Sequence, residues 1–210
     1  MAPNLADALR LMLVTDDALL AGRDPVAVCA AAVRGGVTAV QLRLKRVPPR
    51  ELVELARALV ASLPVPVLVN DRPDVALAAG AAGVHLGPDD LAPGFARRVL
   101  GPAAIIGASV GLAGEVPRAR EADYWGVGPW RATGTKGDAG AALGRDGILR
   151  ILSLAGEKPC LAIGGVRPED VSLLRALGCA GVAVASGMLV GDPEENARRY
   201  GERGAGSGER

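Results

Sequence analysis

Eight short apolar runs alternate with segments of helical spacing along this chain of 210 residues. Each run has the length of a buried strand and ends in glycine, proline, hydroxyl or charged residues. Eight strand–helix units are the number that closes a barrel, so the sequence predicts an α/β fold, a single (β/α)8 TIM barrel. The predicted strands cover residues 11–14, 38–43, 65–69, 83–86, 103–108, 124–127, 159–163 and 181–185.

The length favours one domain. A barrel of this kind typically needs about 250 residues, so loops must be short and little is left for a second domain. We assign residues 1–203 to the barrel and residues 204–210, rich in glycine, to a flexible C-terminal tail. An open doubly wound sheet is the alternative, but it usually carries a glycine-rich fingerprint after its first strand, where Thr15-Asp16-Asp17 stands here.

Several helix starts have clear signals. Asp24-Pro25 supplies an N-cap and a first-position proline, and Pro48-Pro49 begins another helix. We also predict that Asp89-Asp90 begin the helix that runs to about Leu100.

The composition excludes some classes of partner. The net charge is +1 and aromatic residues make up 2% of the chain, so a nucleic-acid or acidic-membrane partner is not expected. The three cysteines lie far apart in apolar surroundings and predict buried, reduced thiols. Residues 1–8 lack the features of a signal peptide and no apolar run is long enough for a membrane span, so we expect a cytoplasmic protein.

The second predicted strand carries cations. Gln41, Arg43 and Lys45 alternate, and the period of two in an extended chain places all three on one face. Because buried cations need a partner, we expect an anion there. Asn70 and Asp71 end the third strand, and Asp89 and Asp90 follow the fourth. These carboxylates predict a Mg²⁺ site, with an ion-pair network as the alternative.

Later strand ends predict further anion sites. Thr133, Gly134, Thr135 and Lys136 offer hydroxyl, N–H and ammonium donors after the sixth strand. Two small-residue stretches, Gly164-Gly165 and Ala185-Ser186-Gly187, follow strands seven and eight, where barrels often bind phosphate. The single histidine, His85, lies within a strand and is expected to orient or pack rather than to act as an acid or base.

In this order on successive strands, these residues resemble the thiamine-phosphate synthase (thiamine-phosphate pyrophosphorylase) family. The resemblance covers about residues 11–200. Its motifs are Gln41-Leu42-Arg43-Leu44-Lys45, Val69-Asn70-Asp71, Val84-His85-Leu86-Gly87-Pro88-Asp89-Asp90-Leu91, Gly107-Ala108-Ser109, Gly128-Pro129 with Thr133-Gly134-Thr135-Lys136, Ala162-Ile163-Gly164-Gly165-Val166 and Val184-Ala185-Ser186.

The resemblance implies a transferase that joins a hydroxymethylpyrimidine diphosphate to thiazole phosphate, giving thiamine phosphate and diphosphate by a dissociative substitution. It implies Mg²⁺ bound by Asp71 and Asp90. The implied catalytic residues are Arg43, Lys45, Ser109 and Lys136. The implied pyrimidine diphosphate site comprises Gln41, Arg43, Lys45, Asn70, Ser109 and Lys136, and the implied thiazole phosphate site comprises Thr133, Thr135, Gly165, Ala185 and Ser186.

The chain departs from the family pattern at several positions. Leu44 replaces an acidic or polar residue, Pro88 a glutamine and Gly111 a histidine, and Trp130-Arg131-Ala132 displaces an aromatic before the threonine motif. Two alternatives share the barrel, namely a thiazole tautomerase, which relies on a histidine near Gly111, and a non-catalytic barrel that binds thiazole or thiamine phosphate. The expected partners are small molecules, and a homo-oligomer is left open.

Overall fold

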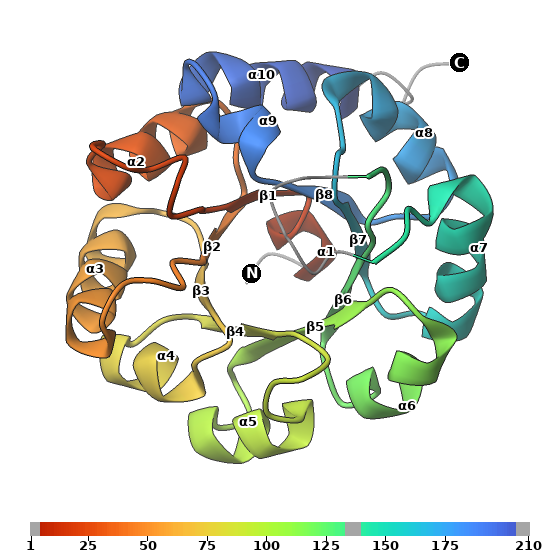
Figure 1. Cartoon of the computed structure of the whole chain (residues 1–210), viewed down its shortest axis with the longest axis horizontal. Helices are drawn as coiled ribbons and strands as arrows, with labels where there is room; N and C mark the ends of the chain where they lie inside the picture. The colour runs from red at the N-terminus through yellow and green to blue at the C-terminus, as the bar shows by residue number, and fades with distance from the viewer. Residues whose placement is uncertain (1–4, 133–139, 205–210) are drawn as a thin grey trace.

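The strands form a closed barrel of eight parallel strands in sequence order (Figure 1). The computed structural model describes residues 5–132 and 140–204. The strands are β1 (Leu11–Val14), β2 (Ala39–Leu42), β3 (Val67–Asn70), β4 (Gly83–Leu86), β5 (Ile105–Val110), β6 (Tyr124–Val127), β7 (Cys160–Ile163) and β8 (Gly181–Val184). The predicted barrel is therefore confirmed, and the open sheet is excluded because β1 pairs with β8.

A ring of helices surrounds the strands (Figure 1). The α-helices are α1 (Leu5–Ala8), α2 (Pro25–Arg34), α3 (Pro49–Ser62), α4 (Pro73–Ala79), α5 (Pro93–Leu100), α6 (Val116–Ala119), α7 (Gly144–Ala155), α8 (Val171–Ala176), α9 (Ser186–Leu189) and α10 (Pro193–Gly204), with 3₁₀ turns η1 (Ala113–Glu115) and η2 (Pro168–Asp170). The sequence did not predict the four-residue helices α1 and α9.

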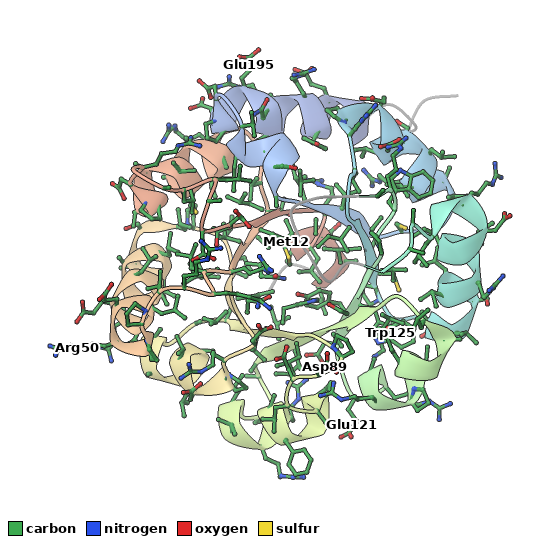
Figure 2. All side chains as sticks on the ribbon, in the orientation of Figure 1. Met12, Arg50, Asp89, Glu121, Trp125 and Glu195 are labelled. Atoms are coloured by element: carbon green, nitrogen blue, oxygen red, sulfur yellow. The ribbon has the colours of Figure 1, made fainter. Side chains whose placement is uncertain are left out.

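Alternation along the strands produces two apolar layers. Met12 on β1 belongs to a cluster inside the barrel, whereas its neighbours Leu11 and Leu13 pack toward the helices. Figure 2 shows Met12 within the ring of strands and Trp125 outside it. The Trp125 indole donates a hydrogen bond to Ala119 O of α6 at 2.9 Å. Leu5 of α1 packs on the inner cluster. The interior is therefore filled by side chains, as small parallel barrels require.

Local signals explain most helix starts, with one correction. Asp24 caps α2 by accepting from Val26 N at 2.9 Å, as predicted. The prediction that Asp89-Asp90 begin the next helix is wrong, because α5 begins at Pro93. Asp90 instead accepts from Gly87 N at 2.6 Å and closes the turn after β4. The same short polar side chain that suits an N-cap also suits a turn, so sequence spacing did not distinguish the two.

Two further predictions concern burial and membranes. Cys29, Cys160 and Cys179 are buried and unpaired by disulfides, as expected, and burial raises the pKa of the Cys29 thiol to about 12. Among the helices of the described ranges, none combines the length and apolar character needed to cross a bilayer.

Candidate active site

A cavity of about 720 Å³ lies at the carboxyl ends of the strands. Residues at or just beyond the ends of all eight strands line it, which is where barrels of this kind carry their sites. The predicted site residues that line the cavity are Gln41, Arg43, Asn70, Ser109, Gly165, Ala185 and Ser186. Residues that are far apart in the sequence are thus brought to one place by barrel closure.

The polar centre of the cavity is organised by His85. Its Nδ1 lies 2.9 Å from the Tyr124 hydroxyl, and its Nε2 lies 3.0 Å from Ser109 Oγ. Burial raises the pKa of Tyr124 well above its usual range, so the phenol remains neutral. The ring of His85 is therefore fixed by both nitrogens and presents Ser109 to the cavity, which agrees with an orienting role.

The cationic segment after β2 is held by the end of β1. Arg43 N donates to Thr15 Oγ1 at 2.7 Å, and Lys45 N donates to Asp17 Oδ2 at 2.9 Å. The Arg43 guanidinium lies 3.5 Å from Asp16 Oδ2. Thr15-Asp16-Asp17 therefore supports this part of the site, a role that its sequence pattern alone does not indicate.

The predicted common face of strand two is only partly correct. Gln41 and Arg43 line the cavity, but Lys45 is not among its lining residues. Strand β2 ends at Leu42, so the alternation of an extended chain does not reach Lys45. Its amine instead lies 3.5 Å from Asp71 Oδ2.

Asp71 and Asp90 face each other at the ends of β3 and β4. Burial raises the pKa of Asp71 to about 6, together with its hydrogen bond to Asp90 and the negative charge there, while Lys45 opposes the shift. Asp71 has φ 64°, and within the described ranges it is the one non-glycine residue with positive φ. Its backbone N–H donates to His85 O at 2.8 Å. A strained backbone that brings two carboxylates together is typical of a functional site.

The carboxylate pair fits a hard divalent cation. Carboxylate oxygens are the ligands Mg²⁺ prefers, and Mg²⁺ commonly takes one or two of them and completes its shell with water and substrate phosphate. The described residues contain no group of three or more His, Cys, Asp or Glu side chains suited to a metal. The ion pair of Lys45 with Asp71 shows that the alternative of a charge network is also present. Asp89, in contrast, is exposed beyond the end of β4 (Figure 2).

The turns after β7 and β8 form another part of the cavity wall. Gly164 and Gly165 have positive φ values of 88° and 66°. Within the described part of the chain, the backbone N–H groups of Gly165 and Val166, and of Ser186 and Gly187, donate to no protein acceptor. Four N–H donors at a cavity wall suit an anion.

Gly165 has a second structural reason to lack a side chain. A Cβ at this position would lie 2.9 Å from Arg131 Cβ, because the segment after β6 packs directly on this turn. Trp130 N donates to Ile163 O at 2.7 Å, and Arg131 N donates to Gly164 O at 2.9 Å. A bulky substitution of Gly165 would therefore disturb the protein wall as well as any bound anion.

An ion pair that no sequence pattern indicates lies next to this turn. The Arg131 guanidinium contacts both oxygens of Asp170, with 2.6 Å between Nη2 and Oδ1. Asp170 is buried and also accepts from Arg167 N at 2.8 Å. Although burial acts to raise the pKa of Asp170, the hydrogen bonds from Arg131 and Arg167 lower it overall. In the sequence Arg131 stands out only as a departure from a family pattern, and no sequence spacing links it to a residue 39 positions later.

The departures from the family pattern fall at different places. Leu44 is buried in the outer apolar layer, so it does not face the cavity. Pro88 and Gly111 both line it. A Cβ at Gly111 would lie 2.8 Å from Gly128 O, so a histidine there would require a shift of the chain. Thr133, Thr135 and Lys136 lie outside the described residues.

Comparison with known proteins gives a consistent result. The family described as thiamine monophosphate synthase matches residues 11–188. The thiamine-phosphate synthase of Xanthobacter autotrophicus is 48% identical over 196 residues, which cover 90% of this chain and 92% of that protein. The corresponding protein of Azorhizobium caulinodans is 46% identical over 196 residues, covering 91% and 92%.

A solved structure gives the same answer. The thiamine phosphate pyrophosphorylase from Pyrococcus furiosus superposes with a TM-score of 0.82 and 31% identity, covering 95% of this chain and 97% of that one. Other barrels, such as 3-hexulose-6-phosphate synthase at 16% identity, share the fold alone. The family match spans the strand ends that form the cavity. The chain belongs to the thiamine-phosphate synthase family.

Proposed function

We propose that this protein is a thiamine-phosphate synthase, a transferase that joins the pyrimidine methylene of a hydroxymethylpyrimidine diphosphate to the nitrogen of thiazole phosphate. The products are thiamine phosphate and diphosphate. The observation that carries the proposal is the coincidence of family membership with a cavity that brings Arg43, Asn70 and Ser109 together beside the pair Asp71 and Asp90.

The pyrimidine diphosphate occupies the β2 to β5 side of the cavity. Arg43 is held there by a hydrogen bond to Thr15 and an ion pair with Asp16, and Ser109 is held by a hydrogen bond with His85. Gln41 and Asn70 supply amide groups for the pyrimidine. In a dissociative substitution the diphosphate leaves before the thiazole nitrogen attacks, so the main requirement is stabilisation of charge on the leaving group. Arg43 in the cavity wall and Lys45 beside Asp71 would supply that charge, and Lys136, outside the described residues, is the further cation that the sequence predicts.

Asp71 and Asp90, which are not among the residues that line the cavity, would hold Mg²⁺ next to its wall at Asn70. The support is their mutual approach and the raised pKa of Asp71, because two carboxylates stay close at neutral pH most readily when a cation lies between them. When bound, the ion supplies positive charge to the diphosphate oxygens. Lys45, 3.5 Å from Asp71, places its own charge at the same edge.

Thiazole phosphate occupies the β7 to β8 side. The backbone N–H groups of Gly165 and Ser186 point to this role, since neither has a protein acceptor within the described ranges. Ala185 contributes a small side chain to the wall, and Thr133 and Thr135 are the predicted hydroxyl donors. The two substrates thus lie on opposite sides of one cavity, with the reacting atoms between them.

One observation argues against the tautomerase alternative. That activity relies on a histidine near position 111, whereas the chain has its single histidine at 85 and no room for a side chain at Gly111 without movement. A non-catalytic phosphate-binding barrel would have no use for Asp71 and Asp90.

The test is incubation of the protein with both substrates and Mg²⁺, followed by measurement of diphosphate and thiamine phosphate. Formation of both products in equal amounts is expected. Interconversion of thiazole tautomers without diphosphate release would identify the tautomerase instead. Binding of thiazole phosphate with no reaction would identify a carrier.

A further inference from the structure

The turns after β7 and β8 form one wall of the cavity but come from separate parts of the chain. Val166 lies in the turn after β7, Gly187 lies in the first turn of α9 directly after β8, and both line the cavity. Four backbone N–H groups in these turns have no protein acceptor in the described ranges. An anion bound by all four requires that the two turns keep a fixed separation, because hydrogen bonds weaken steeply with distance and angle.

One side chain contacts both turns from behind. Tyr200 of α10 is 3% exposed, and its hydroxyl donates to Val166 O at 2.9 Å. The same hydroxyl occupies the space in which a Cβ at Gly187 would lie. Figure 1 shows α10 running along α9 and α8, outside the strands that precede the two turns. Tyr200 is not among the residues that line the cavity, so it would act without touching substrate.

The chemistry of the hydroxyl suits a fixed support. Burial raises the pKa of Tyr200 to about 12, with the charges of Glu169 and Asp170 acting in the same direction. The phenol is therefore a neutral donor at any working pH. By engaging Val166 O, it fixes the peptide that follows Val166, and it has a rigid ring that loses little conformational freedom.

Gly187 completes the contact. Its φ lies outside the positive range, so the backbone alone does not require glycine there. The reason for glycine is instead the close approach of the Tyr200 hydroxyl. The two residues form a pair, in which the absence of one side chain makes room for the other.

We propose that Tyr200 is a positioning residue that couples the turns after β7 and β8 and thereby sets the geometry of the thiazole phosphate site. This inference rests on the proposed function for the identity of the anion. It assigns a role in substrate recognition to α10, which contributes no residue to the cavity.

The experiment compares Tyr200→Phe with the unaltered protein in steady-state kinetics. Loss of one hydrogen bond is expected to raise KM for thiazole phosphate about three- to tenfold. The KM for the pyrimidine diphosphate and kcat at saturation are expected to change less than about twofold. A parallel rise in both KM values, or no change in either, would overturn the proposal.

A second variant tests the pairing. Gly187→Ala should displace the Tyr200 hydroxyl and produce the same selective rise in KM. Because phenylalanine at 200 leaves room for the added methyl, the double variant should resemble Tyr200→Phe alone rather than show the product of two effects. Fully multiplicative effects would contradict a shared contact.

Two controls separate this role from stability and from the proposed function. Arg34→Ala removes the ion pair with Glu194 that joins α2 to α10, at 2.9 Å, without touching either turn. It should leave both KM values unchanged. Calorimetric binding of inorganic phosphate and of thiazole phosphate should weaken in Tyr200→Phe even if the protein proves to have no synthase activity. Failure of synthesis with this selective loss would refute the proposed function alone, and unchanged binding would refute the positioning role.

Discussion

Oδ2 of Asp71 lies 3.5 Å from Nζ of Lys45, and the same carboxyl group also forms a hydrogen bond with Asp90. An ordinary surface ion pair would not need a second carboxylate or a backbone with φ 64°. The arrangement therefore favours a site that receives additional positive charge. A cation held by Asp71 and Asp90 would approach the diphosphate from the same edge as Lys45.

We expect Asp71→Asn to lower turnover by about a hundredfold or more, because charge on the leaving diphosphate would lose much of its stabilisation. Asparagine tolerates positive φ, so folding should be preserved. The measurement is turnover against Mg²⁺ concentration for Asp71→Asn and Asp90→Asn, with Asp89→Asn as a matched control at an exposed position. If both inner variants keep the metal dependence and rate of the unaltered protein, the ion lies elsewhere.

Lys136 lies outside the described residues, so it offers a test that depends on the sequence alone. Lys136→Ala should depress turnover strongly and leave the melting temperature nearly unchanged, because the sequence predicts an exposed cation and such a cation contributes little to folding. Kinetics and thermal unfolding of the same preparation provide the measurement. A large fall in melting temperature with normal kinetics would instead indicate a structural role for this lysine.

His85→Gln should reduce kcat by less than about tenfold. An amide can replace one of the two hydrogen bonds that the ring makes with Tyr124 and Ser109, so Ser109 would be less well oriented but still present. The shape of the pH–rate profile should be unchanged. Disappearance of one limb of that profile would show that the imidazole transfers a proton, contrary to the orienting role.

Arg131→Ala should destabilise the protein by about 1–2 kcal/mol, because it leaves the carboxylate of Asp170 buried without its main partner. The value is below that of a fully buried pair, since the Arg131 side chain is 41% exposed and its charge is screened. Urea unfolding at pH 7 measures the change. The control is Arg50→Ala, which removes only an exposed ion pair with Glu54. Lys158→Ala would not serve, because the Lys158 amine donates to Ala122 O.

The ion pair of Arg131 with Asp170 also predicts that the stability of the protein depends on pH. The pKa of Asp170 is lower in the folded protein than in the unfolded chain, where it is about 3.9. Its contribution to stability is therefore present above the unfolded pKa and is lost as the pH falls through the folded value. The difference in free energy of unfolding between the unaltered protein and Arg131→Ala should shrink below about pH 4. A difference that stays constant down to pH 2 would exclude this ion pair as its source.

Much of the fold could be predicted from the sequence because its signals are local. The period of two in strands, the cap at Asp24 and the glycines after strand ends act over a few residues. The number of strands then predicted a closed barrel. Parallel barrels carry their sites at the carboxyl ends of the strands, and this rule predicted that Gln41, Asn70 and Ser109 lie at one cavity.

Only the tertiary structure decided how those residues are supported. Pairing of Arg131 with Asp170, the contact of Tyr200 with Val166 and Gly187, and the placement of Lys45 beside Asp71 join positions that no sequence period relates. Asp90 illustrates the limit, since a carboxylate after a strand can cap a helix or close a turn with similar energy. In the folded protein Asp90 closes the turn and lies beside Asp71 of the neighbouring strand, a contact that exists only once the barrel has closed.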